Sequence, residues 1–569
     1  MTTELRKEAG ESKEAHESRL SATLPLFDVH GYVDDFNRAI VPAYKRGIAD
    51  AELPADAGVA RSIIPPGTAA VRDFSHLAPQ IPELDAARCV GCMTCVSACP
   101  DSAIMGIALP DTQLEGLVST FAATQPDPDL AGATARSRFA RTTKYADVPA
   151  KRGHEPAGFG IFVDPVHCKG CGECVEVCHA LGYDALRMAD KVAREASGES
   201  TLDRFSRDMA LFRSLPPTPE GYRSEKALAD LMLGEHAFGY VGGAGSCAGC
   251  GEASAIRMLL AATRQVHGPN SMGIVAATGC NTVYGSTYPY NPFLVPWTNS
   301  LFENAPADAM GIRARWDQAG HPERRIWALG GDGAMYDIGF QALSRMVASG
   351  ADIKVMVLDT QVYSNTGGQA STASFGGQVT KLSAFGRELH GRPEPRKELG
   401  RILIGHGEVY VAQTTPAHIN HFYRAVIDAN AYPGPAVVIV YTPCQPEHGI
   451  ADDSSSAQAK LAVTSRAFPL FVYDPRRGET IAERLSLQGN PAPKEDWFTA
   501  PDGTVQDFLS FARTEGRFAP HFTKEGPSEE ILATQADRLG NWHTLQEMSG
   551  MEPGWSAASV AATDASDPG

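Results

Sequence analysis

The chain has 569 residues and a formal net charge of −17, and it contains no run rich in Lys and Arg. Its length allows about two to four domains, and its acidic balance excludes nucleic acid as the expected partner. No apolar run is long enough to span a bilayer, and residues 1–20 lack the apolar core of a signal peptide. We therefore expect a cytoplasmic protein with no membrane partner.

Residues 1–78 are expected to form an N-terminal arm and linker. The stretch 25–50, PLFDVHGYVDDFNRAIVPAYKRGIAD, mixes apolar and charged residues without a strong helical or strand period. Such a segment has too few apolar residues for a core of its own, so we expect it to pack on another part of the protein.

Eight of the 12 cysteines form two arrays with the spacing C-x2-C-x2-C-x3-C. The arrays read CVGCMTCVSACP (89–100) and CKGCGECVEVCH (168–179). In this pattern three thiolates hold one 4Fe–4S cluster, and the fourth reaches across to a second cluster. Disulfides are not expected in a reducing compartment, which leaves a pair of zinc knuckles as the alternative. The predicted ligands are Cys89, Cys92, Cys95 and Cys178 for one cluster, and Cys99, Cys168, Cys171 and Cys174 for the other.

These arrays predict a ferredoxin-like module over residues 79–190. His179 stands where proline usually follows such an array, but this position ligates nothing. Residues 123–138 are rich in Pro, Gly and Ala, which indicates a surface insertion. A linker is expected over residues 191–234.

Four cysteines lie outside the arrays: Cys247 and Cys250 in GSCAGCGE, Cys280 in ATGCNTVYG and Cys444 in YTPCQPEHG. A CxxC pair can also be a redox pair or half of a zinc site, and a lone cysteine is more often a small buried hydrophobe. Three of these sites lie beside Gly or Pro at expected strand-to-loop transitions. Together the four complete a third set, so a third 4Fe–4S cluster is expected.

Residues 235–480 alternate between expected strands and helices. Short apolar runs rich in β-branched residues predict strands over 273–278, 325–331, 353–359, 409–414 and 436–441. Helices are expected over 336–350 and 416–434, with C-caps at Gly350 and Gly434. This alternation predicts an α/β domain with a mainly parallel sheet covered on both faces. A C-terminal extension over 481–550 and a disordered tail over 551–569 are expected to follow.

Two stretches at expected strand ends have the chemistry of a metal–diphosphate site. They read GDGAMYD (331–337) and TQVYSNTGGQ (360–369). Asp332 offers a carboxylate, Thr360 a hydroxyl and Val362 a loop carbonyl, which are oxygen ligands suited to Mg²⁺. Gly331 and Gly333 let the backbone approach a phosphate closely. An isolated GDG is more often a tight turn capped by aspartate, and the paired loop is what favours the metal site.

GDGAMYDIG, YSNTGGQ, CAGCGE, ATGCNTVYG and the double cysteine array resemble the C-terminal half of pyruvate:ferredoxin oxidoreductase, over roughly residues 65–475. The resemblance implies a thiamine diphosphate-binding α/β fold preceded by a bacterial two-cluster ferredoxin-like α+β module. It implies oxidative decarboxylation of pyruvate with coenzyme A to acetyl-CoA and CO2. Electrons would pass through three 4Fe–4S clusters to ferredoxin or flavodoxin.

The resemblance also assigns roles position by position. It makes Asp332, Thr360 and the carbonyl of Val362 the Mg²⁺ ligands, and Asn365 a catalytic residue beside the thiazolium ring. It makes Cys247, Cys250, Cys280 and Cys444 the ligands of a proximal cluster next to the cofactor. The implied cofactor contacts are Glu252, Cys280, Gly331, Asp332, Gly333, Ala334, Thr360, Gln361, Val362, Tyr363, Ser364 and Asn365.

The single-chain enzymes of this family carry another thiamine-binding domain, which holds the glutamate that activates the cofactor and the residues that grip the substrate carboxylate. We therefore expect the β-type subunit of a split 2-oxoacid:ferredoxin oxidoreductase, inactive alone, in a heterotetramer with two copies of each subunit. The same chemistry on 2-oxoglutarate or an aryl 2-oxo acid is an alternative. A stand-alone thiamine lyase or decarboxylase is another. A non-catalytic electron-transfer adaptor is a third, but it would not need Asp332, Thr360 and Asn365.

Overall fold

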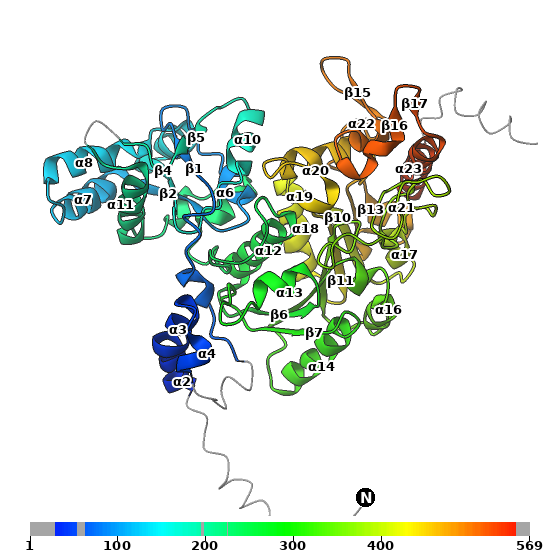
Figure 1. Ribbon diagram of the computed structural model, residues 1–569, viewed down its shortest axis with the longest axis horizontal. Helices are drawn as coiled ribbons and strands as arrows, with labels where there is room; N and C mark the ends of the chain where they lie inside the picture. Colours follow the sequence, from blue (N-terminus) through cyan, green and yellow to red (C-terminus); the bar gives the residue numbers. More distant parts are fainter. Residues whose placement is uncertain (1–28, 54–62, 195–197, 225, 553–569) are drawn as a thin grey trace, which may run out of the picture.

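The computed structural model describes residues 29–53, 63–194, 198–224 and 226–552 (Figure 1). A large α/β domain carries a smaller cysteine-bearing module at one side, and a small group of helices from the N-terminal region lies below this module and beside the large domain. The fold class predicted from the sequence is confirmed. The predicted tail beyond residue 552 and the first 28 residues lie outside the described part. No helix in that part is both long and apolar enough to cross a membrane.

An eight-stranded sheet forms the large domain, in the order β13-β12-β10-β11-β9-β8-β6-β7. Its six strands from β10 to β7 are parallel, whereas β12 and β13 extend the edge in antiparallel pairs. Each of the five predicted strands is present, displaced by at most one residue at either end. The strands are β6 (Met272–Ala277), β7 (Trp297–Ser300), β8 (Arg325–Gly330), β9 (Lys354–Asp359), β10 (Tyr410–Thr414), β11 (Ala436–Tyr441), β12 (Phe471–Tyr473) and β13 (Leu485–Ser486).

Helices cover both faces of this sheet, so its central strands are buried throughout. Alternate residues of β9 join different cores because strand side chains point to opposite faces. Met356 packs in the core that contains α12 (Gly251–His267) and α18 (Ile419–Ala431). Val357 packs in the core that contains α14 (Ala305–Gln318) and α16 (Phe340–Ala348).

The two predicted helix ends differ in outcome. Gly350 follows α16 with a φ of +71°, the left-handed conformation expected of a C-terminal glycine. The predicted cap at Gly434 is wrong, because α18 ends at Ala431 and Tyr432 is extended. Tyr432 precedes Pro433, and the proline ring disfavours helical backbone at the residue before it.

The cysteine-bearing module has a repeated plan. Each cysteine loop leads into a short helix, α6 (Thr94–Ala98) or α10 (Glu173–Ala180), and these two helices pack on each other. The outer strands β1 (Gln80–Leu84) and β5 (Leu186–Asp190) form an antiparallel pair. A second antiparallel sheet contains β2 (Ile104–Pro110), β3 (Phe139–Ala140) and β4 (Ala157–Val163).

Two segments that the sequence left without regular structure are helical. The Pro/Gly/Ala-rich stretch contains α8 (Pro128–Ser137), which Asp127 caps by accepting from the Leu130 N–H, beside α7 (Asp111–Ala122). The expected linker contains α11 (Thr201–Ser214). Met209 of α11 packs in one core with Met105 of β2. The segment is therefore part of the module, and it also connects the module to the large domain.

The N- and C-terminal segments both pack on the large domain. Phe36, in the segment that begins with α2 (Val29–Asp35), lies edge-on to Tyr288 with ring centroids 5.8 Å apart, in line with the expected packing of this arm. The C-terminal extension contains α22 (Phe508–Ala512) and α23 (Glu529–Met548). Phe511 and Trp542 from these helices are fully buried in the core that also contains Val357.

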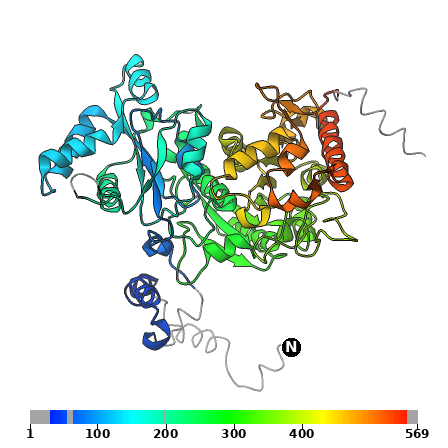
Figure 2. The ribbon, with the colours of Figure 1, turned by 45° about the horizontal axis from the view of Figure 1, so that its top comes forward.

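Helix α12 lies between the cysteine-bearing module and the sheet, as Figures 1 and 2 both show. Ser254 donates to the carbonyl of Ala98 (3.0 Å), and Nε of Arg257 donates to the carbonyl of Cys99 (2.7 Å). These carbonyls are at the C-terminal end of α6, where a helix has no internal donors for them. The N-terminal half of α12 therefore caps α6 and fixes the module against the large domain.

Candidate functional site

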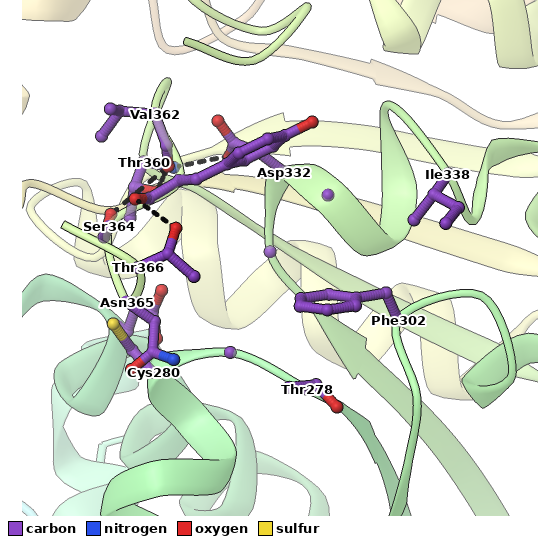
Figure 3. Close-up of a pocket in the computed structure, with 15 residues that line it drawn as sticks. Thr278, Cys280, Phe302, Asp332, Ile338, Thr360, Val362, Ser364, Asn365 and Thr366 are labelled. Atoms are coloured by element: carbon purple, nitrogen blue, oxygen red, sulfur yellow. Dashed lines mark hydrogen bonds between the residues drawn. The ribbon is translucent and has the colours of Figure 1, made fainter. Parts of the chain in front are cut away.

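The carboxyl ends of four parallel strands meet at one cavity of about 280 Å³ (Figure 3). Thr278 follows β6, Phe302 follows β7, Asp332 follows β8 and Thr360 follows β9. Parallel strands end at a common edge of the sheet, and this edge is where ligands bind in such folds. The two stretches singled out in the sequence therefore face one another, as expected.

The three predicted Mg²⁺ ligands lie together at one end of this cavity. The Thr360 N–H donates to Oδ1 of Asp332 (3.2 Å), and the Thr360 hydroxyl donates to the carbonyl of Val362 (2.9 Å). Ser371 donates to the other carboxylate oxygen of Asp332 (2.6 Å). Burial raises the pKa of Asp332 well above its usual range, and the nearby charge of Asp359 adds to the shift. A divalent cation beside these oxygens would provide the missing counter-charge, so the donor set fits Mg²⁺.

The two glycines of the GDG stretch leave open space beside the backbone. A Cβ atom on Gly331 would come no closer than 3.7 Å to its neighbours, and one on Gly333 no closer than 3.6 Å. These are ordinary contacts, so packing within the protein does not require glycine at either position. Both residues line the cavity. The open space suits a diphosphate that lies directly against the main chain.

Ala334 and Gln361 are the predicted cofactor contacts that do not line the cavity. Ala334 faces the core behind it. Gln361 is fully buried with a φ of +59°, and its side-chain oxygen accepts from Arg517 (2.6 Å). Its carbonyl accepts from Ser374 (2.6 Å), so neither of its oxygens is directed to a ligand. The other predicted contacts all line the cavity.

Sequence reasoning missed several residues around the cavity. Thr278 and Gly279 directly precede Cys280, so the motif itself was a usable signal for them. Ile338 stands in the quoted GDGAMYDIG motif, which was a signal for it as well, whereas Phe302 carries no local signal because strand order brings it there. Figure 3 shows these two apolar side chains on the side of the cavity opposite Asn365 and Cys280.

His448 was also missed, and it connects the two halves of the site. Its Nε2 lies 2.7 Å from the carbonyl of Thr360, and its Nδ1 lies 3.4 Å from the backbone nitrogen of Cys444. Burial lowers the pKa of His448 well below its usual range, so the ring is neutral. These partners assign the proton to Nε2, which donates to Thr360, while Nδ1 accepts from the Cys444 N–H.

A buried ion pair from the C-terminal extension holds the loop at Gln361. Nε of Arg517 donates to Glu515 (2.6 Å), while another nitrogen of its guanidinium donates to Gln361. Glu515 also accepts from Tyr441 (3.0 Å) and Gln458 (2.9 Å). The extension is therefore part of the support of the loop that carries Thr360 and Val362.

Each predicted set of four cysteines lines a cavity of its own. None of the 12 cysteines, all of which lie in the described ranges, forms a disulfide. The first cavity has Cys89, Cys92, Cys95 and Cys178 on its walls, and the second has Cys99, Cys168, Cys171 and Cys174. The third has Cys247, Cys250, Cys280 and Cys444. The cross-over of the fourth cysteine between the arrays is thus present in the fold.

Burial disfavours the ionised form of thiols in these cavities. Burial raises the pKa of the Cys89 thiol to about 11 and those of Cys168 and Cys444 to about 12. Iron would stabilise the thiolates against this shift. Backbone N–H groups, such as that of Gly91 toward Cys89, also favour the thiolate.

Helix starts favour anionic sulfur at the third set. Cys250 is the N-cap of α12, Cys444 is the N-cap of α19 (Gln445–His448), and Cys280 is the first residue of α13 (Cys280–Gly285). A helix N-terminus carries partial positive charge, which stabilises a thiolate there.

The cavity of the third cysteine set adjoins the one that contains Asp332. Both are lined by Glu252, Cys280, Thr360, Ser364 and Asn365. Glu252 is buried between them, and this burial raises its pKa to about 7. A group bound over Asp332 would therefore lie next to the third cysteine set, with Asn365 and Glu252 at the boundary.

Exposed apolar side chains lie near the site. Among the described residues that line the cavity, none is Arg or Lys. Large apolar side chains near it remain exposed: Ile338 by 63%, Leu301 by 60% and Val283 by 53%. Clusters of exposed apolar side chains around a pocket are typical of surfaces that another protein unit covers.

Comparison with known proteins identifies two regions. The family model for the thiamine pyrophosphate enzyme C-terminal TPP binding domain matches residues 277–440, and that for the 4Fe-4S binding domain matches residues 82–105. The probable pyruvate-flavodoxin oxidoreductase of Escherichia coli is 30% identical over 544 residues, which cover 84% of this chain and 42% of that protein. The pyruvate:ferredoxin oxidoreductase of Moorella thermoacetica is 28% identical over 80% of this chain and 41% of that protein.

The chain thus spans less than half the length of the curated relatives that it matches. Among solved structures, the 2-oxoglutarate:ferredoxin oxidoreductase from Magnetococcus marinus is 18% identical and covers 57% of this chain and 92% of its own, with a TM-score of 0.33. This structural likeness is too weak to support an inference.

Breaking the buried ion pair between Arg517 and Glu515 should destabilise the large domain. We expect Arg517→Met to lower the free energy of unfolding by about 3–5 kcal/mol, because Glu515 is left as an unpaired buried charge. The double variant Arg517→Met/Glu515→Gln should recover much of this loss, since no charge then lacks a partner. Urea unfolding monitored by circular dichroism would test both. A double variant no more stable than Arg517→Met would contradict this account.

Proposed function

The chain is related to the pyruvate:ferredoxin and pyruvate-flavodoxin oxidoreductases, and we propose that it supplies the thiamine diphosphate-binding and electron-transfer part of such an enzyme. The reaction would convert pyruvate and coenzyme A to acetyl-CoA and CO2, with electrons passed to ferredoxin or flavodoxin. One observation carries this proposal. The cavity with the Asp332, Thr360 and Val362 oxygens shares a wall of five residues with the cavity lined by four cysteines.

In this proposal the residues at the strand ends hold the cofactor. Asp332, Thr360 and the Val362 carbonyl bind Mg²⁺, and the open backbone at Gly331 and Gly333 receives the diphosphate. A 2-oxo acid that loses CO2 leaves a carbanion. Thiamine diphosphate, when bound, would stabilise this carbanion.

The residues at the boundary of the two cavities act on the reacting end. Asn365 lines both, so its amide can hydrogen-bond the substrate beside the cofactor. Glu252 is a buried residue that lines both cavities, and it would contact the cofactor there. Its raised pKa lets it carry a proton near neutral pH.

Three clusters form the proposed route for electrons. The set at Cys247, Cys250, Cys280 and Cys444 would hold the cluster next to the cofactor. The two sets of the ferredoxin-like module would carry electrons onward, and the contacts of α12 with α6 support a fixed position of the module. The stand-alone lyase alternative does not need this arrangement.

A further protein unit is proposed to complete the site. The lining residues offer no cation for a substrate carboxylate, and the exposed Ile338, Leu301 and Val283 favour coverage of the mouth. We propose a second thiamine-fold unit there, with this chain as a β-type subunit in a heterotetramer. Pyruvate is the proposed substrate because the curated relatives are named for it.

Metal analysis tests the number of clusters. The anaerobically purified chain should contain about twelve iron and twelve acid-labile sulfide atoms, from three clusters of four. Cys444→Ala should lower both to about eight while the two arrays stay loaded. A wild-type content near eight would contradict the third cluster, and zinc in place of iron would contradict electron transfer.

Replacing the central carboxylate tests the cofactor site. Asp332→Asn should weaken the binding of thiamine diphosphate in the presence of Mg²⁺ more than about 100-fold, because even groups that only support a metal ligand contribute 10–100-fold. Isothermal titration calorimetry measures this effect, and iron content should stay unchanged. The matched control is Asp308→Asn, an exposed carboxylate on α14. Unchanged binding in Asp332→Asn would mean that the GDG stretch is only a turn.

Activity of the isolated and assembled protein tests the function itself. The cluster-loaded chain alone should show no pyruvate- and coenzyme A-dependent reduction of methyl viologen, because it lacks a cation for the carboxylate. A complex purified from the native host through a tag on this chain should be active. Activity of the chain alone would contradict the split enzyme. A complex active only with another 2-oxo acid would correct the substrate, and one inactive with every 2-oxo acid would refute the proposal.

A further inference from the structure

Arg257 is a buried guanidinium at the junction of α12 with the ferredoxin-like module. Its side chain is fully buried. Nε donates to the carbonyl of Cys99 (2.7 Å), and one terminal nitrogen donates to the carbonyl of Val96. The other terminal nitrogen has no hydrogen-bond partner within the described residues.

The charge of Arg257 is not balanced by an ion pair. Within the described part of the chain, no carboxylate forms one with it. Asp101, the carboxylate that acts on it electrostatically, is already paired with Lys169 (2.6 Å). A buried charge is costly unless it is compensated, and two carbonyl contacts compensate a full positive charge only in part.

The groups that face Arg257 include cysteines of both arrays. Cys99, with Cys168, Cys171 and Cys174, lines one cluster cavity, and Cys95 lines the other. Nε of Arg257 binds the main chain of Cys99 itself. The guanidinium therefore lies beside a ligand of the proposed cluster, where it favours negative charge on that cluster.

The Cys99 cavity also lies on the side of the module that faces the large domain. Lys169, which lines this cavity, donates to the carbonyl of Ser246 (2.7 Å), and Ser246 precedes Cys247 of the third cysteine set. A cluster in this cavity would therefore be the middle one of the three.

We propose that Arg257 is the counter-charge of the middle cluster and raises its reduction potential, so that this cluster accepts electrons from the one beside the cofactor. A reduced cluster carries one more negative charge than the oxidised one, so a fixed positive charge favours the reduced state. Arginine suits this role because it stays protonated even when buried. The inference rests on the proposed function, since it needs clusters in the cysteine cavities.

The competing explanation is that Arg257 only caps the end of α6. A neutral donor at this position would then serve as well, and the cluster potential would not change. Arg257→Gln keeps a donor and removes the charge, whereas Arg257→Lys keeps the charge. Arg264→Gln is the matched control, because Arg264 lies on the same helix, is also buried, and donates to His236 (3.1 Å) away from the cysteines.

The readout is an anaerobic redox titration of the cluster-loaded chain, followed by electron paramagnetic resonance. Arg257→Gln should lower the midpoint potential of one cluster enough to change its oxidised-to-reduced ratio about tenfold at a fixed potential, which is 59 mV for a one-electron couple. Arg257→Lys and Arg264→Gln should stay close to the wild type. Loss of the middle cluster in Arg257→Gln but not in Arg257→Lys would equally support the counter-charge.

Two results would overturn the inference and leave the proposed function standing. One is an unshifted potential in Arg257→Gln with full iron content. The other is loss of the cluster in both variants, which would assign Arg257 to packing. A wild-type chain that holds no clusters would instead refute the proposed function as well.

Discussion

The site depends on one constraint, which is that six parallel strands end at the same edge of the sheet. This edge brings Asp332 to Thr360 although 28 residues separate them, and it brings Cys280 and Cys444 to the same place from β6 and β11. Because each of these residues stands within three positions of the end of a buried strand, it has little freedom. The positions of the oxygen and sulfur donors therefore follow from strand order more than from the loops themselves.

The site also concentrates buried charge that the protein alone compensates only in part. Burial raises the pKa of both Asp332 and Glu252, and Arg257 is buried without an acidic partner in the described part of the chain. Other buried charges of the same domain are paired, as Arg396 is with Asp359 and Arg517 with Glu515. Asp332 and Glu252 differ from these pairs because both also line the cavity, where a ligand can reach them.

The sequence was sufficient to predict features that depend on local residue patterns or on fixed residue spacing. The cysteine spacing predicted which four thiols share each cavity, and apolar runs predicted the five strands of the sheet. It was insufficient where a contact depends on tertiary packing. Nothing near Arg517 or His448 in the sequence indicates that they support the loop at Gln361 and Thr360. The helices α8 and α11 were missed because Gly, Pro and charged residues hid their periodicity, whereas tertiary contacts stabilise them.

Helix α12 gives a physical reason for joining the proposed chemistry and the proposed electron route in one chain. Cys250 and Glu252 stand at its start, and Arg257 follows about 10 Å along its axis at 1.5 Å per residue. Any tilt of this helix would move the third cysteine set and the carbonyls of α6 together, since Ser254 and Arg257 bind those carbonyls directly. A flexible connection would let the distance between the cysteine sets vary during turnover. A single buried helix that caps its neighbour keeps this distance fixed, and it does so with the same side chain that supplies positive charge to the junction.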